Sequence, residues 1–308
     1  MSQSRPAADS NYPATARLPR LFSGLLRQLF GSLQSAVGTI IVSVFLILAL
    51  FGPMLAPYAE NDQKQPVAAA PSAAYPFGTD HLGRDVFSRV ILGAGSILAK
   101  AGLGTLVAVI FGTALGLWIG FAGGWLDEVI SRLIDALLAT PALLVALVIL
   151  GIVRAMDIPT GSFGAWLSDR AVLLVIALVY VPIVARVVRS ATLDVKTREF
   201  IQAARIRGES TVYIIFREIL PSVVPALVVE ASLRFSYAIF LVASLGFLGV
   251  GARPPSEDWG LMVNENRGGL YALTPWALNY PAAAIAILVI GVNLLSDAVK
   301  NIVQKGTG

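Results

Sequence analysis

The stretch Ala101–Leu126, AGLGTLVAVIFGTALGLWIGFAGGWL, decides the fold class, because none of its residues carries a charge. A helix rises about 1.5 Å per residue, so about 20 apolar residues cross the roughly 30 Å hydrocarbon core of a bilayer. The stretch therefore predicts a transmembrane helix. Glycine recurs at every fourth position, at Gly112, Gly116, Gly120 and Gly124. Glycines at this spacing share one helix face, which predicts a groove for a closely packed neighbouring helix.

The composition of the whole chain is typical of an integral membrane protein. Of the 308 residues, 56% are hydrophobic and 14% are charged, too few charges to cover a soluble domain. The chain has no cysteine, which excludes disulfides and thiolate chemistry, and His81 alone cannot form a metal cluster. The pI is about 9.5, but the basic residues lie mainly between apolar blocks. The preference of basic residues for the cytoplasmic side explains this charge without nucleic-acid binding.

Further apolar blocks on both sides of this stretch predict an all-α membrane protein with six transmembrane helices. The predicted spans are residues 36–56, 101–126, 133–153, 171–188, 222–250 and 279–297. They form one transmembrane domain, 35–303, between a cytoplasmic segment, 1–34, and a cytoplasmic tail, 304–308. An even number of spans places both termini on one side, and the strongly basic connection 189–221 identifies that side as cytoplasmic. The polar loops 57–98 and 251–278 then face outward.

The N-terminal segment contains a periodic apolar stretch at residues 17–30. Leu21, Leu25 and Leu29 recur at helical spacing, and arginines flank them. Two interpretations stay open, a short helix on the cytoplasmic membrane surface and an ordinary basic flank before the first span.

The connection Thr197–Pro221 is too polar to cross a membrane but carries helix start and stop signals. We expect Thr197 to cap a short helix, Gly208 to end it in a left-handed turn and Ser210 to cap a second helix. The second helix is expected to end at Pro221 and to carry one apolar stripe, formed by Val212, Phe216, Ile219 and Leu220. Such a pair could form a rigid knob that another protein holds, or a surface elbow that only connects two spans.

The pattern Gln202-Ala203-Ala204, then Gly208, then Leu220-Pro221, resembles the EAA loop of bacterial ABC importer permeases. In that family the first helix of the loop docks into a cleft of the ATP-binding subunit and couples nucleotide-driven closure to movement of the spans. The resemblance assigns coupling to Gln202, Ala203, Ala204, Gly208, Glu218, Leu220 and Pro221. Gln202 stands where the family usually has a glutamate, and Glu218 stands where it often has a histidine. The docking role therefore carries over to this chain, but salt bridges assigned to these two positions in the family do not.

A second resemblance narrows the family. The segment Phe77–Arg89, FGTDHLGRDVFSR, is similar to the outer loop of the second permease subunit in peptide and nickel importers. Its motif positions are Gly78, Asp80, Leu82, Gly83, Arg84 and Asp85. Four later segments are similar to the closing part of the same subunit, namely Phe247–Gly251, Pro254-Pro255, Trp259-Gly260 and Asn293–Asp297. The matches extend over about residues 35–303 and imply the type I ABC importer permease fold.

Two groups of charged residues have open interpretations. The outer loop carries alternating charges, at Asp80, Arg84, Asp85 and Arg89. They fit a contact with a neighbouring subunit or binding protein, but we favour local hydrogen bonds that fix the loop, with Gly78 and Gly83 at its turns. Glu230 and Arg234 lie one turn apart in the predicted fifth span, where an unpaired charge costs at least about 3 kcal/mol. They either line the substrate path near its cytoplasmic end or form an intrahelical pair that faces another helix.

The sequence lacks the Gly-x-x-x-x-Gly-Lys-Ser/Thr phosphate loop, so we expect no ATPase activity in this chain. The resemblance implies one permease of a heterodimer with a homologous permease, two ATP-binding subunits and an extracytoplasmic solute-binding protein in a bacterial inner membrane. ATP and magnesium would be bound by the partners, and no cofactor by this chain. Di- or oligopeptides are the implied substrates, with nickel chelates, glutathione and oligosaccharides as alternatives.

Two other classes of membrane protein are alternatives to the importer. A secondary transporter driven by an ion gradient would be expected to show inverted repeats, broken helices and several buried acids. Asp135 and Glu230 are the obvious carboxylates within the predicted spans, and no internal repeat is visible. A structural membrane scaffold is the third class, and co-purification with an ATP-binding subunit would distinguish it from an importer.

Overall fold

The structure is a computed structural model that describes residues 29–156 and 162–306. In this part of the chain all regular elements are helices and no β-strand occurs. Five helices are long and apolar enough to cross a membrane, or six if the bent pair α4 (Gly124–Leu138) and α5 (Ala142–Ala155) is one span. The predicted all-α membrane fold is thereby confirmed. The periodic stretch 17–30 lies, apart from its last two residues, outside the described part.

The other elements span the following residues. They are α2 (Leu33–Leu55), α3 (Val86–Ala122), α6 (Phe163–Asp169), α7 (Ala171–Val195), α8 (Glu199–Ile206), α9 (Thr211–Tyr213), the π-helical turn η2 (Ile214–Ile219), α10 (Leu220–Phe247), α11 (Trp259–Glu265), the 3₁₀ turn η3 (Gly268–Ala272) and α12 (Pro275–Gly306). The predicted polar loop 251–278 therefore contains α11 and η3, and α12 extends beyond both ends of the sixth predicted span.

α3 begins well before the predicted second span. The Asp85 side chain accepts a hydrogen bond from the Ser88 backbone N–H at 2.8 Å and caps the helix there. Residues 86–98, expected to be loop, are helical because this cap starts the helix and the first turns pack under the outer loop and α11. The outer loop consequently ends at Asp85.

Proline breaks one predicted span and leaves another intact. α4 and α5 meet at an angle of 84° around Pro141, so the third span is not one straight helix. Proline lacks an N–H donor and disfavours helical backbone in the residue before it. Pro182, in the fourth predicted span, lies inside the continuous helix α7. α7 is packed against α3 and α10, and such packing lets a transmembrane helix tolerate proline.

The glycine face of α3 forms the most extensive helix contact of the structure, with α7. A Cβ added at Gly112, Gly116 or Gly120 would lie 2.6, 2.5 and 2.9 Å from the nearest α7 atom. The predicted groove is therefore confirmed at these three positions, and Gly104 extends it against Ile176. Gly124 does not belong to it, since the chain turns at the end of α3 and nothing lies within 4 Å of its added Cβ.

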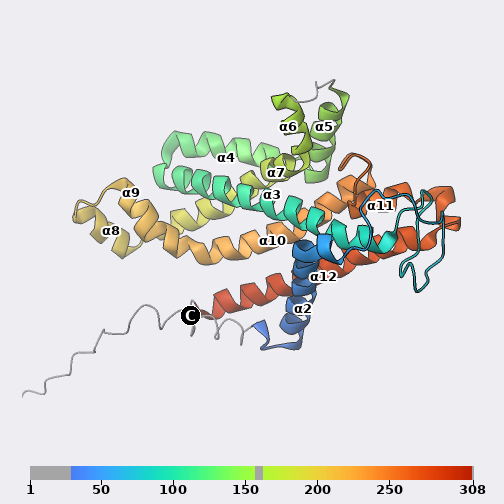
Figure 1. Ribbon diagram of the computed structural model, residues 1–308. Coiled ribbons are helices and arrows are strands. Elements are labelled where there is room, and N and C mark those ends of the chain that lie inside the picture. The colour runs from blue at the N-terminus through green and yellow to red at the C-terminus, as the bar shows by residue number, and fades with distance from the viewer. Residues whose placement is uncertain (1–28, 157–161, 307–308) are drawn as a thin grey trace, which may run out of the picture.

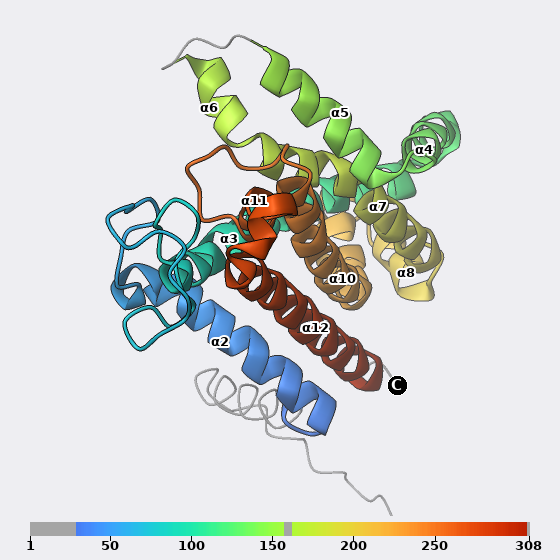
Figure 2. The same ribbon diagram turned by 90° about the vertical axis from the view of Figure 1, so that its right-hand side faces the viewer.

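The helices separate two ends of the molecule. α8 and α9 lie at one end of the bundle, whereas α11 and the outer loop 56–85 lie at the opposite end (Figure 1). α2 packs against α12 and α3, while α10 packs against α3, α7 and α12. α5 and α6 project to one side of this bundle (Figure 2). By the preference of basic residues for the cytoplasmic side, the basic connection between α7 and α10 predicts that the α8 end is cytoplasmic and that the opposite end faces outward.

Candidate functional site

The connection between α7 and α10 forms a compact knob, which we define as residues 197–219. Gly208 has a φ of +78°, so the left-handed turn predicted there is confirmed. The Ser210 hydroxyl accepts a hydrogen bond from the Tyr213 N–H at 3.2 Å, which confirms the second cap. The first cap was assigned wrongly, because Arg198 precedes α8 and the Thr197 hydroxyl instead donates to the Asp194 carbonyl at 3.0 Å. α7 runs on to Val195, which places that carbonyl within reach of Thr197.

The second helix of the knob continues into the membrane instead of ending at Pro221. η2 links α9 to α10, and the helix from Thr211 to Phe247 is continuous. A π-helical turn is wider than an α-helical one, so the proline ring is accommodated at the second position of α10 without stopping the helix. The prediction that Pro221 stops the helix is therefore wrong. The consequence is that the knob and α10 are one rigid element.

The two faces of α8 have different surroundings. Ile201 and Ala204 are buried in an apolar cluster with residues of η2 and the cytoplasmic ends of α3, α7 and α10. Gln202 and Ala203 are exposed, and the Gln202 amide donates to the Thr197 carbonyl at 3.3 Å. Ala204 therefore supports the fold of the knob, whereas Ala203 is accessible to another protein.

The outer surface of the knob carries large apolar side chains. Ile206 is 87% exposed, Val212 65% and Phe216 62%, while Ile219 is fully buried. The single stripe predicted for the second helix is thus divided, because the π-turn changes the direction in which successive side chains point. Clustered apolar residues on an aqueous face are typical of a protein-docking surface.

The remaining predicted coupling residues lie at the base of the knob. Glu218 is half-buried, and its carboxylate lies 4.0 Å from the Arg207 guanidinium. Leu220 is half-buried and Pro221 is exposed, both in the first turn of α10. These positions join the exposed apolar surface of the knob to a membrane span.

Two ion pairs and one hydrogen bond connect α7 and the residue that follows it to α3 and α4. Arg189 of α7 donates from Nη2 to Asp127 Oδ2 of α4 at 2.7 Å, and Arg186 pairs with Asp135. The Lys196 ammonium donates to the Gly120 carbonyl at 2.7 Å, which connects α7 to the end of α3. Asp135, in the last turn of α4, is therefore paired with a residue of α7 and is not an isolated intramembrane acid. A displacement of the knob would be transmitted to α3, α4 and α7 together.

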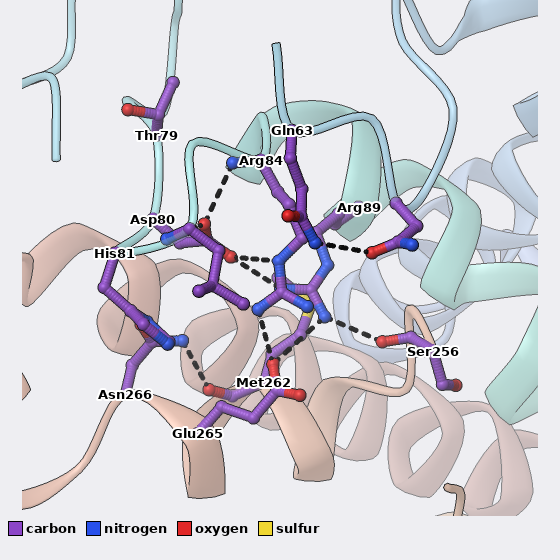
Figure 3. Close-up of polar contacts among 12 residues, drawn as sticks. Gln63, Thr79, Asp80, His81, Arg84, Arg89, Ser256, Met262, Glu265 and Asn266 are labelled. Carbon is purple, nitrogen blue, oxygen red and sulfur yellow. Dashed lines mark hydrogen bonds and ion pairs between the residues drawn. The ribbon is translucent and has the colours of Figure 1, made fainter. Parts of the chain in front are cut away.

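The outer motif folds around buried charges at the opposite end of the molecule (Figure 3). Asp80 accepts hydrogen bonds from Arg84 Nε at 2.6 Å and Arg89 Nη1 at 3.0 Å, and both arginines also pair with Glu265 of α11. Asp80, Arg84 and Arg89 are each 2% exposed or less, too buried to contact a partner. The favoured interpretation, local bonds that fix the loop, is the one that the structure shows.

The other motif positions shape the same loop. Gly78 and Gly83 have φ values of +71° and +72°, so both turns need a glycine. Asp85 caps α3, whereas Leu82 is 42% exposed. His81 packs within the loop region, with its Nδ1 3.2 Å from Asn266 Oδ1.

Two further carboxyl groups lie between the outer loop and the chain before α11. Glu60 shares a hydrogen bond with Glu257, which together with burial and charge repulsion raises the pKa of Glu60 to about 7. Burial alone would raise the pKa of Glu257, but the bond from Glu60 and the charge of Lys100 hold it below its ordinary value. The pair therefore shares a proton near neutral pH.

Glu230 and Arg234 form an ion pair within α10. Arg234 Nε lies 2.7 Å from Glu230 Oε1 without hydrogen-bond alignment, and the guanidinium lies over the rings of Tyr180 and Tyr237 at 5.7 and 4.9 Å. The Tyr237 side chain is 53% exposed in this chain. The pairing is thus observed, while a role in lining the substrate path stays a prediction.

Sequence reasoning missed three residues that hold the outer end together. Glu265 completes the buried charge cluster, the Trp259 indole donates to the Val90 carbonyl at 2.9 Å, and Arg154 donates to carbonyls after α10. Trp259 lies in the motif Trp259-Gly260, but the sequence does not reveal that Arg84 and Arg89 are buried and share a further acid. Nothing in the local sequence indicated which acid it would be.

Comparisons with known proteins agree with this geometry. Residues 112–308 match the family model described as binding-protein-dependent transport system inner membrane component. Residues 25–72 match the N-terminal TM domain of oligopeptide transport permease C.

Curated relatives match most of the chain. The dipeptide transport system permease protein DppC of Alkalihalophilus pseudofirmus is 36% identical, over 96% of this chain and 92% of the relative. The glutathione transport system permease protein GsiD of Pectobacterium atrosepticum is 36% identical, over 84% and 83%. The DppC protein of Haemophilus influenzae is 33% identical, over 86% and 88%.

A solved structure has a similar fold. An inward-facing form of the MetNI methionine ABC transporter superposes with a TM-score of 0.56 at 18% identity, over 70% of this chain and 97% of that one. At this identity the similarity supports the shared fold.

Proposed function

Because the chain belongs to the family of binding-protein-dependent transport system inner membrane components, we propose that it is one permease of an ATP-driven importer of short peptides. It has the type I ABC importer permease fold, and the relatives named for dipeptides and glutathione support this substrate class. Both kinds of compound are short peptides with free carboxylates. Nickel chelates and oligosaccharides have no comparable support from these relatives.

The proposed assembly contains a homologous permease, two ATP-binding subunits and an extracytoplasmic solute-binding protein in a bacterial inner membrane. This chain supplies half of the pathway, binds no cofactor and hydrolyses no ATP, since its sequence has no phosphate loop and ATP with magnesium belongs to the partners. Glu230 and Arg234 are proposed to line the pathway.

The observation that carries the proposal is the knob, which presents an exposed apolar surface on the cytoplasmic side and continues without a break into α10. An ATP-binding subunit that grips this surface would move α10 directly. The ion pair between α7 and α4 and the hydrogen bond between Lys196 and α3 would transmit the same movement to α3, α4 and α7.

Reconstitution of the complex tests this function. The purified chain is expected to show no ATP hydrolysis, and hydrolysis and peptide uptake should appear once the other subunits are added. Measurable hydrolysis by the chain alone, free of contaminants, would contradict the assignment.

Two neighbouring alanines test the docking surface. Ala203→Glu should lower the amount of co-purifying ATP-binding subunit while leaving the chain folded, because Ala203 is exposed. Ala204→Glu should lower the yield of folded chain itself, since Ala204 is fully buried. Ala74→Glu, the same change on the exposed outer loop, is the control and should affect neither. Normal retention of the ATP-binding subunit by Ala203→Glu would show that this face of α8 is not the contact.

A further inference from the structure

A cavity of about 710 Å³ opens at the outer end of the chain, away from the knob and from the Glu230–Arg234 pair. Its wall is formed by α3, α5, the start of α7 and residues 250–257 that follow α10. The volume falls within the range of about 300 to 1,000 Å³ typical of small-molecule sites.

The position of Lys100 places this cavity at the membrane boundary. The uncharged part of α3 that follows it, 101–122, is about 33 Å long at about 1.5 Å per residue, which matches the hydrocarbon thickness. Arg154 lies at the end of α5, and Arg170 directly precedes α7. Both line the same cavity as Lys100, at the outer end of the bundle.

The lining is strongly cationic. Among the residues that the structure describes, Lys100, Arg154, Arg170 and Arg253 line the cavity, and Glu257 is the one carboxylate in its wall. Basic residues next to membrane spans normally collect on the cytoplasmic side. Their concentration at the outer end is therefore not explained by topology.

In the described part of the chain, neutral groups hold two of these arginines, Arg154 and Arg170, in place. Arg154 donates to the carbonyls of Gly249, Gly251 and Ala252 at 2.5, 3.0 and 3.2 Å. The Arg170 guanidinium lies 4.5 Å from the centre of the Trp166 ring and donates to the Trp166 carbonyl at 3.3 Å. Carbonyls and rings orient a guanidinium without neutralising its charge.

The other charges define where an anion would bind. Lys100 is paired with Asp258 at 2.9 Å, and Glu257 is engaged by Glu60, so these groups balance one side of the cavity. Among the described lining residues, the arginine side carries no carboxylate, and apolar residues such as Leu150 and Val172 form part of the same wall. A small solute with a carboxylate and apolar side chains complements both parts.

We propose that this cavity is an entry site that receives the carboxylate of a short peptide as it leaves the solute-binding protein, with Arg170 and Arg253 as contacts and Arg154 as the residue that holds the 249–252 segment in position. This inference rests on the proposed function. It adds a substrate group and its location, at the outer end of the pathway.

The test uses the assembled complex in proteoliposomes with internal ATP and saturating binding protein. A panel of labelled di- and tripeptides first identifies one that the wild-type complex imports. Its uptake rate is then measured for Arg170→Gln/Arg253→Gln, for Arg170→Lys/Arg253→Lys, and for Arg267→Gln. Arg267 is an exposed arginine of the outer end that does not line the cavity, so it is the matched control.

The glutamine pair should lower the uptake rate roughly 5-fold, as expected for the loss of two partly solvated charge contacts. The lysine pair should retain most of the rate because it keeps the charge, and Arg267→Gln should match wild type. A peptide with a photoreactive group next to its carboxyl end should crosslink to residues 250–257 during turnover, and this crosslink should disappear in the glutamine pair.

Other outcomes would overturn the inference separately from the proposed function. Wild-type import with undiminished rates in the glutamine pair would refute the entry site alone, whereas no import of any peptide by wild type would refute the peptide function and the site with it. A rate loss found only in liposomes with anionic lipids would assign the cavity to a lipid headgroup. Weakened binding of peptide-free binding protein would assign it to protein docking.

Discussion

The contact between α3 and α7 can be tested with a single methyl group at Gly116. The added Cβ would lie 2.5 Å from the Ala185 carbonyl oxygen, 2.8 Å from Val188 Cβ and 3.0 Å from the Arg189 backbone nitrogen. Carbon atoms in contact are normally about 3.5 to 4.0 Å apart. Two of the three atoms belong to the backbone, so a change of side-chain rotamer cannot relieve the overlap and α7 must move.

Overpacking of this kind costs about 1 to 3 kcal/mol, and replacing glycine by alanine in a helix returns up to about 1 kcal/mol. Gly116→Ala should therefore lower the free energy of unfolding by about 1 to 2 kcal/mol. Gly151 is the matched control, because it lies inside α5 and nothing in the described chain is within 4 Å of its added Cβ. Gly151→Ala should leave the stability unchanged or raise it slightly.

Thermal unfolding of the detergent-purified chain, followed by tryptophan fluorescence, measures the difference. The midpoint of Gly116→Ala should fall by about 2 to 4 °C for each kcal/mol lost. Gly120→Ala should be milder, since its nearest contacts are at 2.9 to 3.1 Å and include a side-chain methyl. Equal midpoints for Gly116→Ala and Gly151→Ala would refute the close α3–α7 contact.

Three further predictions concern the two ends of the molecule. Asp80→Asn should destabilise the outer end by about 3 to 5 kcal/mol, because two buried arginines lose a shared carboxylate. The rate of proteolysis of the loop 56–85 measures this loss of stability, and Glu128→Gln, a change at an exposed residue, is the neutral control. Gly208→Val should reduce the amount of ATP-binding subunit retained on purification, because valine at a φ of +78° is strained by about 1 to 3 kcal/mol. Gly208→Asn should retain the subunit, because asparagine tolerates a left-handed backbone. Equal retention by the two variants would disprove a need for the turn. Glu60→Gln should raise stability relative to wild type at pH 8 more than at pH 5. The folded-state pKa of about 7 lies above the ordinary 4.5, so wild type loses stability as the pH rises between these values, and a pH-independent difference would contradict the shared proton.

The sequence by itself determined the class of fold and several local structures. Hydropathy over a helix length is a local property, so a span was recognisable in Ala101–Leu126 without knowledge of its neighbours, although α3 begins at Val86 and ends at Ala122. Glycine spacing identified a packing face, and the turn at Gly208 and the cap at Ser210 followed from short-range backbone chemistry. The cytoplasmic loop was located for the same reason, because its charge pattern and its turn residues are contained in one short segment.

The tertiary structure determined which of these local signals produced the expected structure and which residues came into contact. Pro141 breaks a helix while Pro182 does not, because packing around α7 compensates for the missing hydrogen bond. Ala203 and Ala204 are adjacent and chemically identical, yet only the contacts of α8 with α3, α7, α10 and η2 make one exposed and the other buried.

Glu265, which is distant in the sequence, pairs with Arg84 in the buried charge cluster. The cationic cavity is likewise formed by segments that lie far apart in the sequence. Local patterns determine where helices form. Which faces meet depends on the free energy of packing the whole chain, and that term is not contained in any single segment.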